Sequence, residues 1–138
     1  MVIFASMARI STDGFELLYK EETFEAIGIC MDVHRTLGHG FLEIVYKDAM
    51  EFEMVKRSIR FDREKEYKIE YKGIILAHKF YADFVVNSKI ILEVKAAEGG
   101  IADAQLAQCL NYLKASGCKI GLIVNFGRSR LEYRRLIL

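Results

Sequence analysis

Residues 80–96 read "FYADFVVNSKIILEVKA" and decide the fold, because they predict two neighbouring β-strands that meet near Asn87. Side chains along a strand alternate between its two faces, so Ile91, Glu93 and Lys95 share one face. A charged side chain in such an apolar strand is costly to bury unless it is paired, hydrogen-bonded or bound to a metal. We therefore expect another part of the chain to supply partners for Glu93 and Lys95.

Asp83, the acid of the preceding strand, is the first candidate partner. A two-residue turn would pair Asp83 with Leu92 and put the two acids on opposite faces, whereas a three-residue loop, residues 87–89, pairs Asp83 with Glu93 directly. Two adjacent carboxylates repel each other and need a cation between them. We therefore predict the longer loop, or a bulge, and a divalent ion, Mg²⁺ or Mn²⁺, beside which Lys95 would offset charge on a phosphate. The alternative is that Glu93 and Lys95 form an exposed pair on a half-solvated strand.

Three segments outside this region have the apolar spacing of helices. The first is residues 22–35 and the second residues 41–56, and the glycine-containing segment 36–40 separates them. The third is residues 101–115, and Gly117 ends it. The apolar residues that we expect on the core side of the three helices are Phe24, Ile27, Met31, Leu42, Val45, Ala49, Phe52, Ala102, Leu106, Leu110 and Leu113.

The remaining segments predict strands. Residues 66–76 alternate between apolar and polar and predict a hairpin that turns at Lys72–Gly73. Residues 119–127 are almost continuously apolar, which is typical of a strand covered on both faces, and residues 131–138 form the last strand. A helix between the strand of Glu93 and the strand of residues 119–127 implies a parallel pair. The order α-α-β-β-β-β-α-β-β predicts an α/β fold with a mixed sheet flanked by helices.

The composition fits one globular domain over residues 1–138, in which we expect residues 1–12 to form a flexible tail. The net charge of +1 argues against a protein that holds nucleic acid by a general basic excess, but it leaves room for a local basic patch. No apolar run reaches the roughly 20 residues that a membrane-spanning helix needs. Three widely spaced cysteines without metal-ligand spacing predict small buried side chains in a reduced, cytoplasmic protein.

Two motifs resemble those of a known group of proteins. Asp83, nine further residues and Glu93-Val94-Lys95 resemble the D-x(n)-(D/E)-x-K signature of the PD-(D/E)XK nuclease superfamily. Residues 40–46, GFLEIVY, resemble G-x-x-E-x-x-Y, the motif that names the small GxxExxY proteins of that superfamily. The resemblance continues through YKG, ADFVV, ILEVKA, QCLNYLKASG and GLIVNFG and covers residues 22–138. The chain departs from the family at His39, where the family usually has proline.

The resemblance implies a restriction-endonuclease-like core and a metal-dependent nuclease that hydrolyses the phosphodiester bonds of nucleic acid. Asp83, Glu93 and Glu43 would hold Mg²⁺ or Mn²⁺, and these three acids together with Lys95 would be the catalytic residues. Tyr46 lies one turn beyond Glu43 on the same side of its helix. It would either hydrogen-bond to the site or belong to the core.

Gln105, Gln108 and Tyr112 share one face of the third predicted helix. Gln108-x-x-x-Tyr112 resembles the Q-x-x-x-Y motif of RecB-type exonucleases, which lies beside the active centre and contacts DNA. Gln105 stands where many GxxExxY proteins carry a histidine. The resemblance implies that the three residues bind nucleic acid or support the site, and a solvated helix surface is the alternative.

The expected partner is nucleic acid, DNA rather than RNA, with no membrane. A homodimer would help so small a domain to hold a duplex. The competing hypothesis is a module without catalysis that keeps the nuclease fold and binds nucleic acid or another partner, because a fold does not fix a function.

Overall fold

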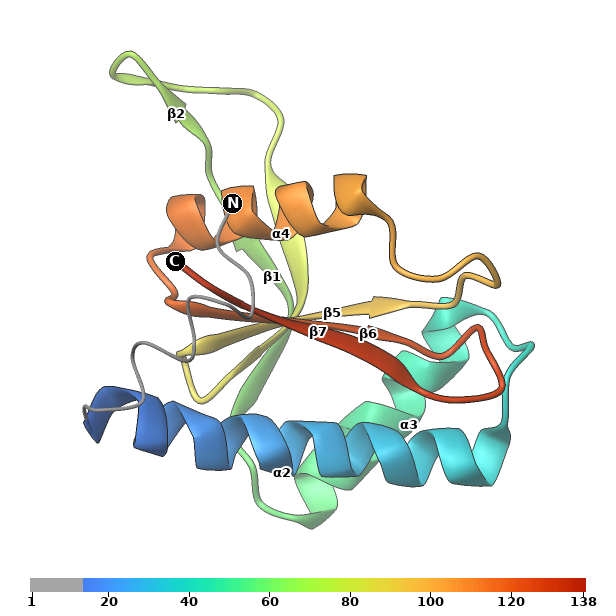
Figure 1. Cartoon of the computed structure of the whole chain (residues 1–138). Helices are drawn as coiled ribbons and strands as arrows, with labels where there is room; N and C mark the ends of the chain where they lie inside the picture. Colours follow the sequence, from blue (N-terminus) through green and yellow to red (C-terminus); the bar gives the residue numbers. More distant parts are fainter. Residues whose placement is uncertain (1–13) are drawn as a thin grey trace.

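The computed structural model describes residues 14–138, and the tail that we predict for residues 1–12 lies outside them (Figure 1). The described elements are, in chain order, α2 (Gly14–Leu37), α3 (Glu43–Lys56), β1 (Phe61–Tyr67), β2 (Glu70–Tyr71), β3 (Ile74–Ile75), β4 (Phe80–Val86), β5 (Ile90–Lys95), α4 (Asp103–Ser116), β6 (Ile120–Asn125) and β7 (Glu132–Ile137). The second and third predicted helices and the later strands lie where the sequence predicts them, whereas α2 begins eight residues before the predicted helix 22–35, and five strands rather than four precede α4.

One mixed sheet organises the domain. Its strand order is β1-β4-β5-β6-β7, with β5 and β6 parallel and every other neighbouring pair antiparallel. α4 connects β5 to β6 and covers one face of the sheet, while α2 and α3 cover the other face (Figure 1). The predicted parallel pair is therefore confirmed, and β6 is buried along its whole length, as a strand covered on both faces should be.

The turn between β4 and β5 fixes how the two strands pair. Phe84 lies opposite Leu92 and Val86 opposite Ile90, so residues 87–89 form a three-residue loop. The first two loop residues have φ angles of 53° and 58°, and the N–H of Lys89 donates to the carbonyl of Val86 at 3.0 Å. The longer loop of the two alternatives is therefore confirmed.

The faces that α2 and α3 turn to the sheet agree only in part with the prediction, because Ile27 is buried and Ala49 packs against the core as expected but other predicted core residues do not. Phe24 and Met31 of α2 are exposed, and so are Leu42, which precedes α3, and Phe52 of α3. The residues that fill the core on this side include Ala26, Ile27, Cys30 and Val33 of α2 and Tyr46, Met50 and Met54 of α3. Both helices carry apolar residues on two neighbouring faces, so their spacing alone could not show which face packs on the sheet.

The strand predicted from residue 66 onward is in fact divided. β1 begins earlier, at Phe61, and ends at Tyr67, after which β2 and β3 form a separate two-stranded sheet. This second hairpin projects away from the main sheet (Figure 1). Its turn at Lys72–Gly73 is as predicted, with φ angles of 49° and 81°. The alternation of apolar and polar residues continues from β1 into β2, because strands of both sheets have the same period of two. The sequence pattern therefore does not show where the first sheet ends.

The three cysteines, Cys30, Cys109 and Cys118, are buried thiols, as the sequence predicts. Burial raises the pKa of Cys30 and Cys109 to about 12, so both are protonated and packed as small apolar side chains. Within residues 14–138, no helix is long and apolar enough to cross a membrane.

Candidate active site

Asp83 and Glu93 lie across from each other on β4 and β5, where regular pairing of these two strands ends. The last regular pair on this side is Phe84 with Leu92. One residue further, the N–H of Asp83 donates to Glu93 Oε2 at 2.9 Å, and the N–H of Val94 donates to Asp83 Oδ2 at 2.8 Å. Each carboxylate is thus held by the backbone of the opposite strand, and the two acids are brought together.

Glu93 is in an unfavourable place for a negative charge. It is only 6% exposed, and burial, followed by the charge of Asp83, raises its pKa to about 7. The hydrogen bond from the Asp83 N–H and the positive charges of Lys95 and Lys47 act in the opposite direction but do not cancel the effect. Near neutral pH this carboxyl group therefore exchanges a proton readily and would gain from a nearby cation.

Lys47 of α3 is a residue of this site that the sequence did not reveal. Its Nζ lies 2.9 Å from Asp83 Oδ1 and also donates to Glu64 Oε1 on β1, and the residue is 7% exposed. Burial lowers the pKa of Lys47, but the hydrogen bonds to Glu64 and Asp83 outweigh this effect and the pKa is raised overall. Lys47 therefore stays charged and neutralises Asp83. The only sequence signal for it is a lysine between the buried residues Tyr46 and Met50.

Glu64 takes part through a local distortion of β1. Its φ angle is 53°, in the left-handed region that is rare for residues other than glycine. The pairing of β1 with β4 runs from Arg63 opposite Phe84 to Lys65 opposite Ala82 and omits Glu64. This break in the pairing of β1 with β4 lies beside the end of the regular pairing of β4 with β5 at Asp83. Lys47 contacts a side chain at each of the two breaks. Backbone strain of this kind often occurs at functional sites.

The structure does not bring Glu43 together with the other two acids. Glu43 is the first residue of α3 and is exposed, and within the described residues no group of three or more His, Cys, Asp or Glu side chains is placed to hold a metal. Lys47 lies one helical turn after Glu43, on the same side of α3. Its role as a metal ligand stays a prediction.

Tyr46 does not touch the acids. Its hydroxyl donates to the carbonyl of Gly38 at 2.7 Å and accepts from the N–H of Phe41 at 3.2 Å. Its ring is fully buried and stacks on Phe126 with centroids 4.5 Å apart. Of the two readings that the sequence left open, the core tyrosine is the one that the structure shows, and it fixes the glycine-containing loop before α3.

Lys95 ends β5 and lies opposite Asn125 of the parallel strand β6. Strand alternation puts it on the same face as Glu93, and its positive charge lowers the pKa of that carboxyl group. It is half-buried at the end of its strand.

The residues of α4 divide into two groups. Tyr112 stacks on Phe80 with centroids 4.0 Å apart, and burial followed by the charges of Glu93 and Asp83 raises its pKa. It therefore lies within electrostatic reach of the acids, and Gln108 is exposed on the same helix. Gln105 has a different role, because its side-chain oxygen accepts the N–H of Ala102 at 3.0 Å and so caps the start of α4.

This arrangement, a mixed sheet covered by helices on both faces with one acid on each of two adjacent strands, is that of restriction-endonuclease-like proteins. A family model described as the PD-(D/E)XK nuclease superfamily matches residues 20–136, and the chain belongs to this superfamily.

Two further comparisons bear on the relatives of the chain. No curated protein matches it. The crystal structure of SSO0001 is similar, with a TM-score of 0.54 and 18% sequence identity over 69% of this chain. The match spans 50% of the SSO0001 chain, and at this identity the likeness shows the fold alone.

Proposed function

We propose that this protein is a metal-dependent nuclease that hydrolyses phosphodiester bonds, with DNA as its substrate rather than RNA. The observation that carries the proposal is the juxtaposition of Asp83 and Glu93, each held by the opposite strand, with Lys95 on the face of Glu93. Membership of the PD-(D/E)XK nuclease superfamily supports it. The assignment to the GxxExxY proteins, the homodimer and the cytoplasmic location remain part of the proposal.

The donor set fits a hard divalent cation. Asp83 and Glu93 offer carboxylate oxygens, which Mg²⁺ and Mn²⁺ prefer, and the raised pKa of Glu93 shows that its negative charge lacks full compensation. These two acids would hold the ion, with Glu43 as a further acid at the start of α3. A bound ion would stabilise the negative charge that develops on the phosphate during hydrolysis.

The other residues have roles that follow from their positions. Lys95 would stabilise the developing charge on the phosphate, or orient the attacking water. Lys47 holds Asp83 in place through the 2.9 Å contact with Oδ1 and would not itself need to touch substrate. Gln108 and Tyr112 would contact the nucleic acid from α4.

A cleavage assay tests the proposal. Labelled single- and double-stranded DNA and RNA are incubated with the protein in Mg²⁺ or Mn²⁺. We expect cleavage by the wild type, none by Asp83→Asn or Lys95→Met, and full activity in Lys56→Met, which removes an exposed lysine at the end of α3. Cleavage that survives in Asp83→Asn would contradict the proposal.

Mn²⁺ binding measured by calorimetry separates the role of Asp83, as a metal ligand, from the role of Lys95. Lys95→Met should still bind Mn²⁺, because the lysine supplies charge rather than an oxygen ligand, whereas Asp83→Asn should lose binding. Equal loss in both variants would mean that Lys95 acts by holding the site together.

The second candidate function is a module that binds nucleic acid without cleaving it. The observation that favours it is the ion pair of Asp83 with Lys47, because it compensates the charge of Asp83 without a metal. This function predicts binding of nucleic acid with neither Mn²⁺ binding nor cleavage. The two assays above therefore distinguish it from a nuclease.

A further inference from the structure

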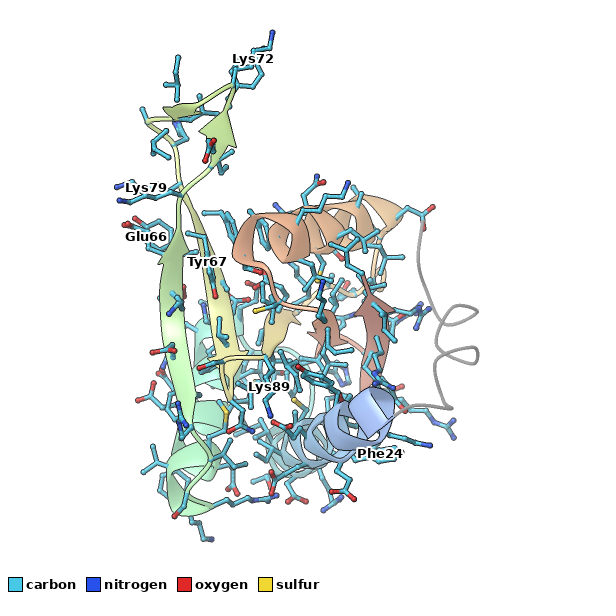
Figure 2. The ribbon with its side chains drawn as sticks, turned by 90° about the vertical axis from the view of Figure 1, so that its left-hand side faces the viewer. Phe24, Glu66, Tyr67, Lys72, Lys79 and Lys89 are labelled. Atoms are coloured by element: carbon cyan, nitrogen blue, oxygen red, sulfur yellow. The ribbon has the colours of Figure 1, made fainter. Side chains whose placement is uncertain are left out.

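The projecting hairpin and α4 enclose a groove on the face of the sheet that carries α4. We call residues 68–79 the arm, and the groove between them and α4 the arm groove. The arm groove has a volume of about 850 Å³. Figure 2 shows the arm extending beyond α4, with Lys72 at its tip and Tyr67 on the side of the strands that faces α4.

Tyr112 belongs both to the arm groove and to the surroundings of the candidate active site. Tyr112 and Gln108 line the arm groove from α4, and Tyr112 is the residue whose pKa the charges of Glu93 and Asp83 help to raise. Glu93 shares its strand face with Ile91, which packs against α4, so a long molecule in the arm groove would lie on the same side of the sheet as Glu93.

The floor of the arm groove is aromatic. Phe80 and Tyr112 line it, and their rings are almost parallel, at 5°, with centroids 4.0 Å apart. Tyr67 continues this stack on Phe80 at 5.1 Å. Ile69 and Ile75 of the arm form an apolar wall, although both are exposed to solvent. Phe80 itself is buried and stacked on both tyrosines, so the surfaces that a flat apolar group could meet are those of Tyr112, Ile69 and Ile75.

The rim of the arm groove is polar. Lys68 of the arm and Lys114 of α4 supply two ammonium groups, and Gln108 and Asn111 supply two amides that can both donate and accept hydrogen bonds. One acid, Glu70, lies among them. The two lysines are exposed and come from the two opposite walls.

We propose that the arm groove binds a single strand of nucleic acid, with its phosphates against Lys68 and Lys114 and its bases against the apolar and aromatic surfaces. The proposal rests on the proposed function for the kind of ligand, and it adds strand type and contact residues. Cationic groups combined with aromatic platforms are the usual means of holding single strands. A duplex keeps its base faces stacked inside and cannot offer them to Ile69, Ile75 or Tyr112. The strand would lead from the arm groove to Asp83 and Glu93.

Binding is measured by fluorescence anisotropy in EDTA, so that no cleavage occurs. The probe is a labelled oligothymidylate of about 12 nucleotides, within the usual site size for single strands, and a blunt duplex serves as comparison. The test protein is the Lys68→Glu/Lys114→Glu variant. Its control is Lys20→Glu/Lys56→Glu, which makes the same charge change on α2 and α3, across the sheet from α4.

We expect the test variant to bind the single strand at least about tenfold more weakly than the control variant. Each lost phosphate contact should reduce the slope of log K against log salt by about 0.7, so the loss of two should reduce it by about 1.4. The milder Lys68→Ala/Lys114→Ala variant should reduce the slope by the same amount, which guards against an effect of the introduced acids. Ile75→Ala should weaken binding without changing the slope, because it removes apolar surface and no charge.

Equal affinities and slopes for the test and control variants would overturn the proposal, and so would equally tight binding of the blunt duplex. A wild type that binds no oligothymidylate would also overturn it and would favour a protein partner for the arm. If the wild type binds through the arm groove but cleaves nothing in Mg²⁺ or Mn²⁺, this proposal stands and the nuclease function fails. If it cleaves, and the arm-groove variants bind like the control, only this proposal fails.

Discussion

Replacing Glu93 with glutamine should stabilise the protein at alkaline pH while it removes metal binding. Glu93 is 6% exposed and faces Asp83, and its pKa of about 7 means that the folded state resists its ionisation. Glutamine has nearly the same shape and keeps an oxygen that can accept the N–H of Asp83, as Glu93 Oε2 does at 2.9 Å. The substitution therefore removes the charge and little else.

The size of the effect follows from the pKa. A rise from the ordinary 4.5 to about 7 is equivalent to roughly 3 kcal/mol, at 1.36 kcal/mol per pH unit. Below pH 4.5 Glu93 is protonated in both the folded and the unfolded state, so it does not lower the free energy of unfolding. Between pH 4.5 and about 7 the unfolded chain releases a proton that the folded protein keeps, so the wild type loses about 1.4 kcal/mol per pH unit from this group. Above about pH 7 the loss is complete.

The amide group of glutamine needs a hydrogen-bond partner in the same buried place. This requirement lowers the free energy of unfolding of the variant by about 1 kcal/mol. We therefore expect Glu93→Gln to be more stable than the wild type by about 1–2 kcal/mol at pH 8, and slightly less stable at pH 4.5. Other titrating groups occur in both proteins and largely cancel in the difference.

Urea unfolding at pH 4.5, 6, 7 and 8 measures this difference in metal-free buffer. Parallel stability curves for the two proteins would refute the argument, because they would mean that Glu93 titrates alike in the folded and unfolded states. Adding Mn²⁺ at pH 8 should stabilise the wild type, by about 2.7 kcal/mol at a concentration one hundred times Kd, and leave Glu93→Gln unchanged.

Three further substitutions test the surroundings of the site by urea unfolding at pH 7. Lys47→Met should lower the free energy of unfolding by about 3 kcal/mol, because it leaves the carboxylate of Asp83 without its cation; a loss below about 1 kcal/mol would show that the ion pair is not needed. Tyr46→Phe should cost about 1–2 kcal/mol, since it removes both hydrogen bonds of a buried hydroxyl and keeps the ring stack; an unchanged stability would show that these bonds contribute nothing net. Gly127→Ala should cost about 3 kcal/mol, because the added Cβ would lie 2.4 Å from the backbone nitrogen of Ala97; a variant as stable as the wild type would mean that the segment shifts freely.

The sequence predicted the central part of the fold because the strands there carry strong local signals. The apolar run that forms β6, the glycine that ends α4 with a φ angle of 78°, and the crossover between β5 and β6 each follow from a short stretch of residues. The same holds for Asp83 and Glu93, whose pairing depends only on a loop of three residues.

The faces of α2 and α3 could not be predicted in the same way. On α3 the positions of Ala49 and Phe52 and the positions of Tyr46 and Met50 both have helical spacing. Contact with the sheet buries the second pair, while Ala49 packs only at the edge of the core and Phe52 is exposed. That choice also decides which polar residue of α3 enters the site. Lys47 is buried because it follows Tyr46 on the selected face, so the error about the face concealed the lysine as well.

The loop length between β4 and β5 could have been inferred from the core as well as from the acids. A two-residue turn would pair Phe84 with Ile91, and strand alternation would then place Glu93 among the apolar side chains beneath α2 and α3. The observed three-residue loop pairs Phe84 with Leu92, keeps that face of both strands apolar, and sets Asp83 opposite Glu93. The hydrophobic core and the acidic pair therefore require the same register. A shift of one residue would bury Glu93 without its partner and also remove apolar side chains from the core, so the geometry of the candidate site is stabilised by the packing of the whole sheet.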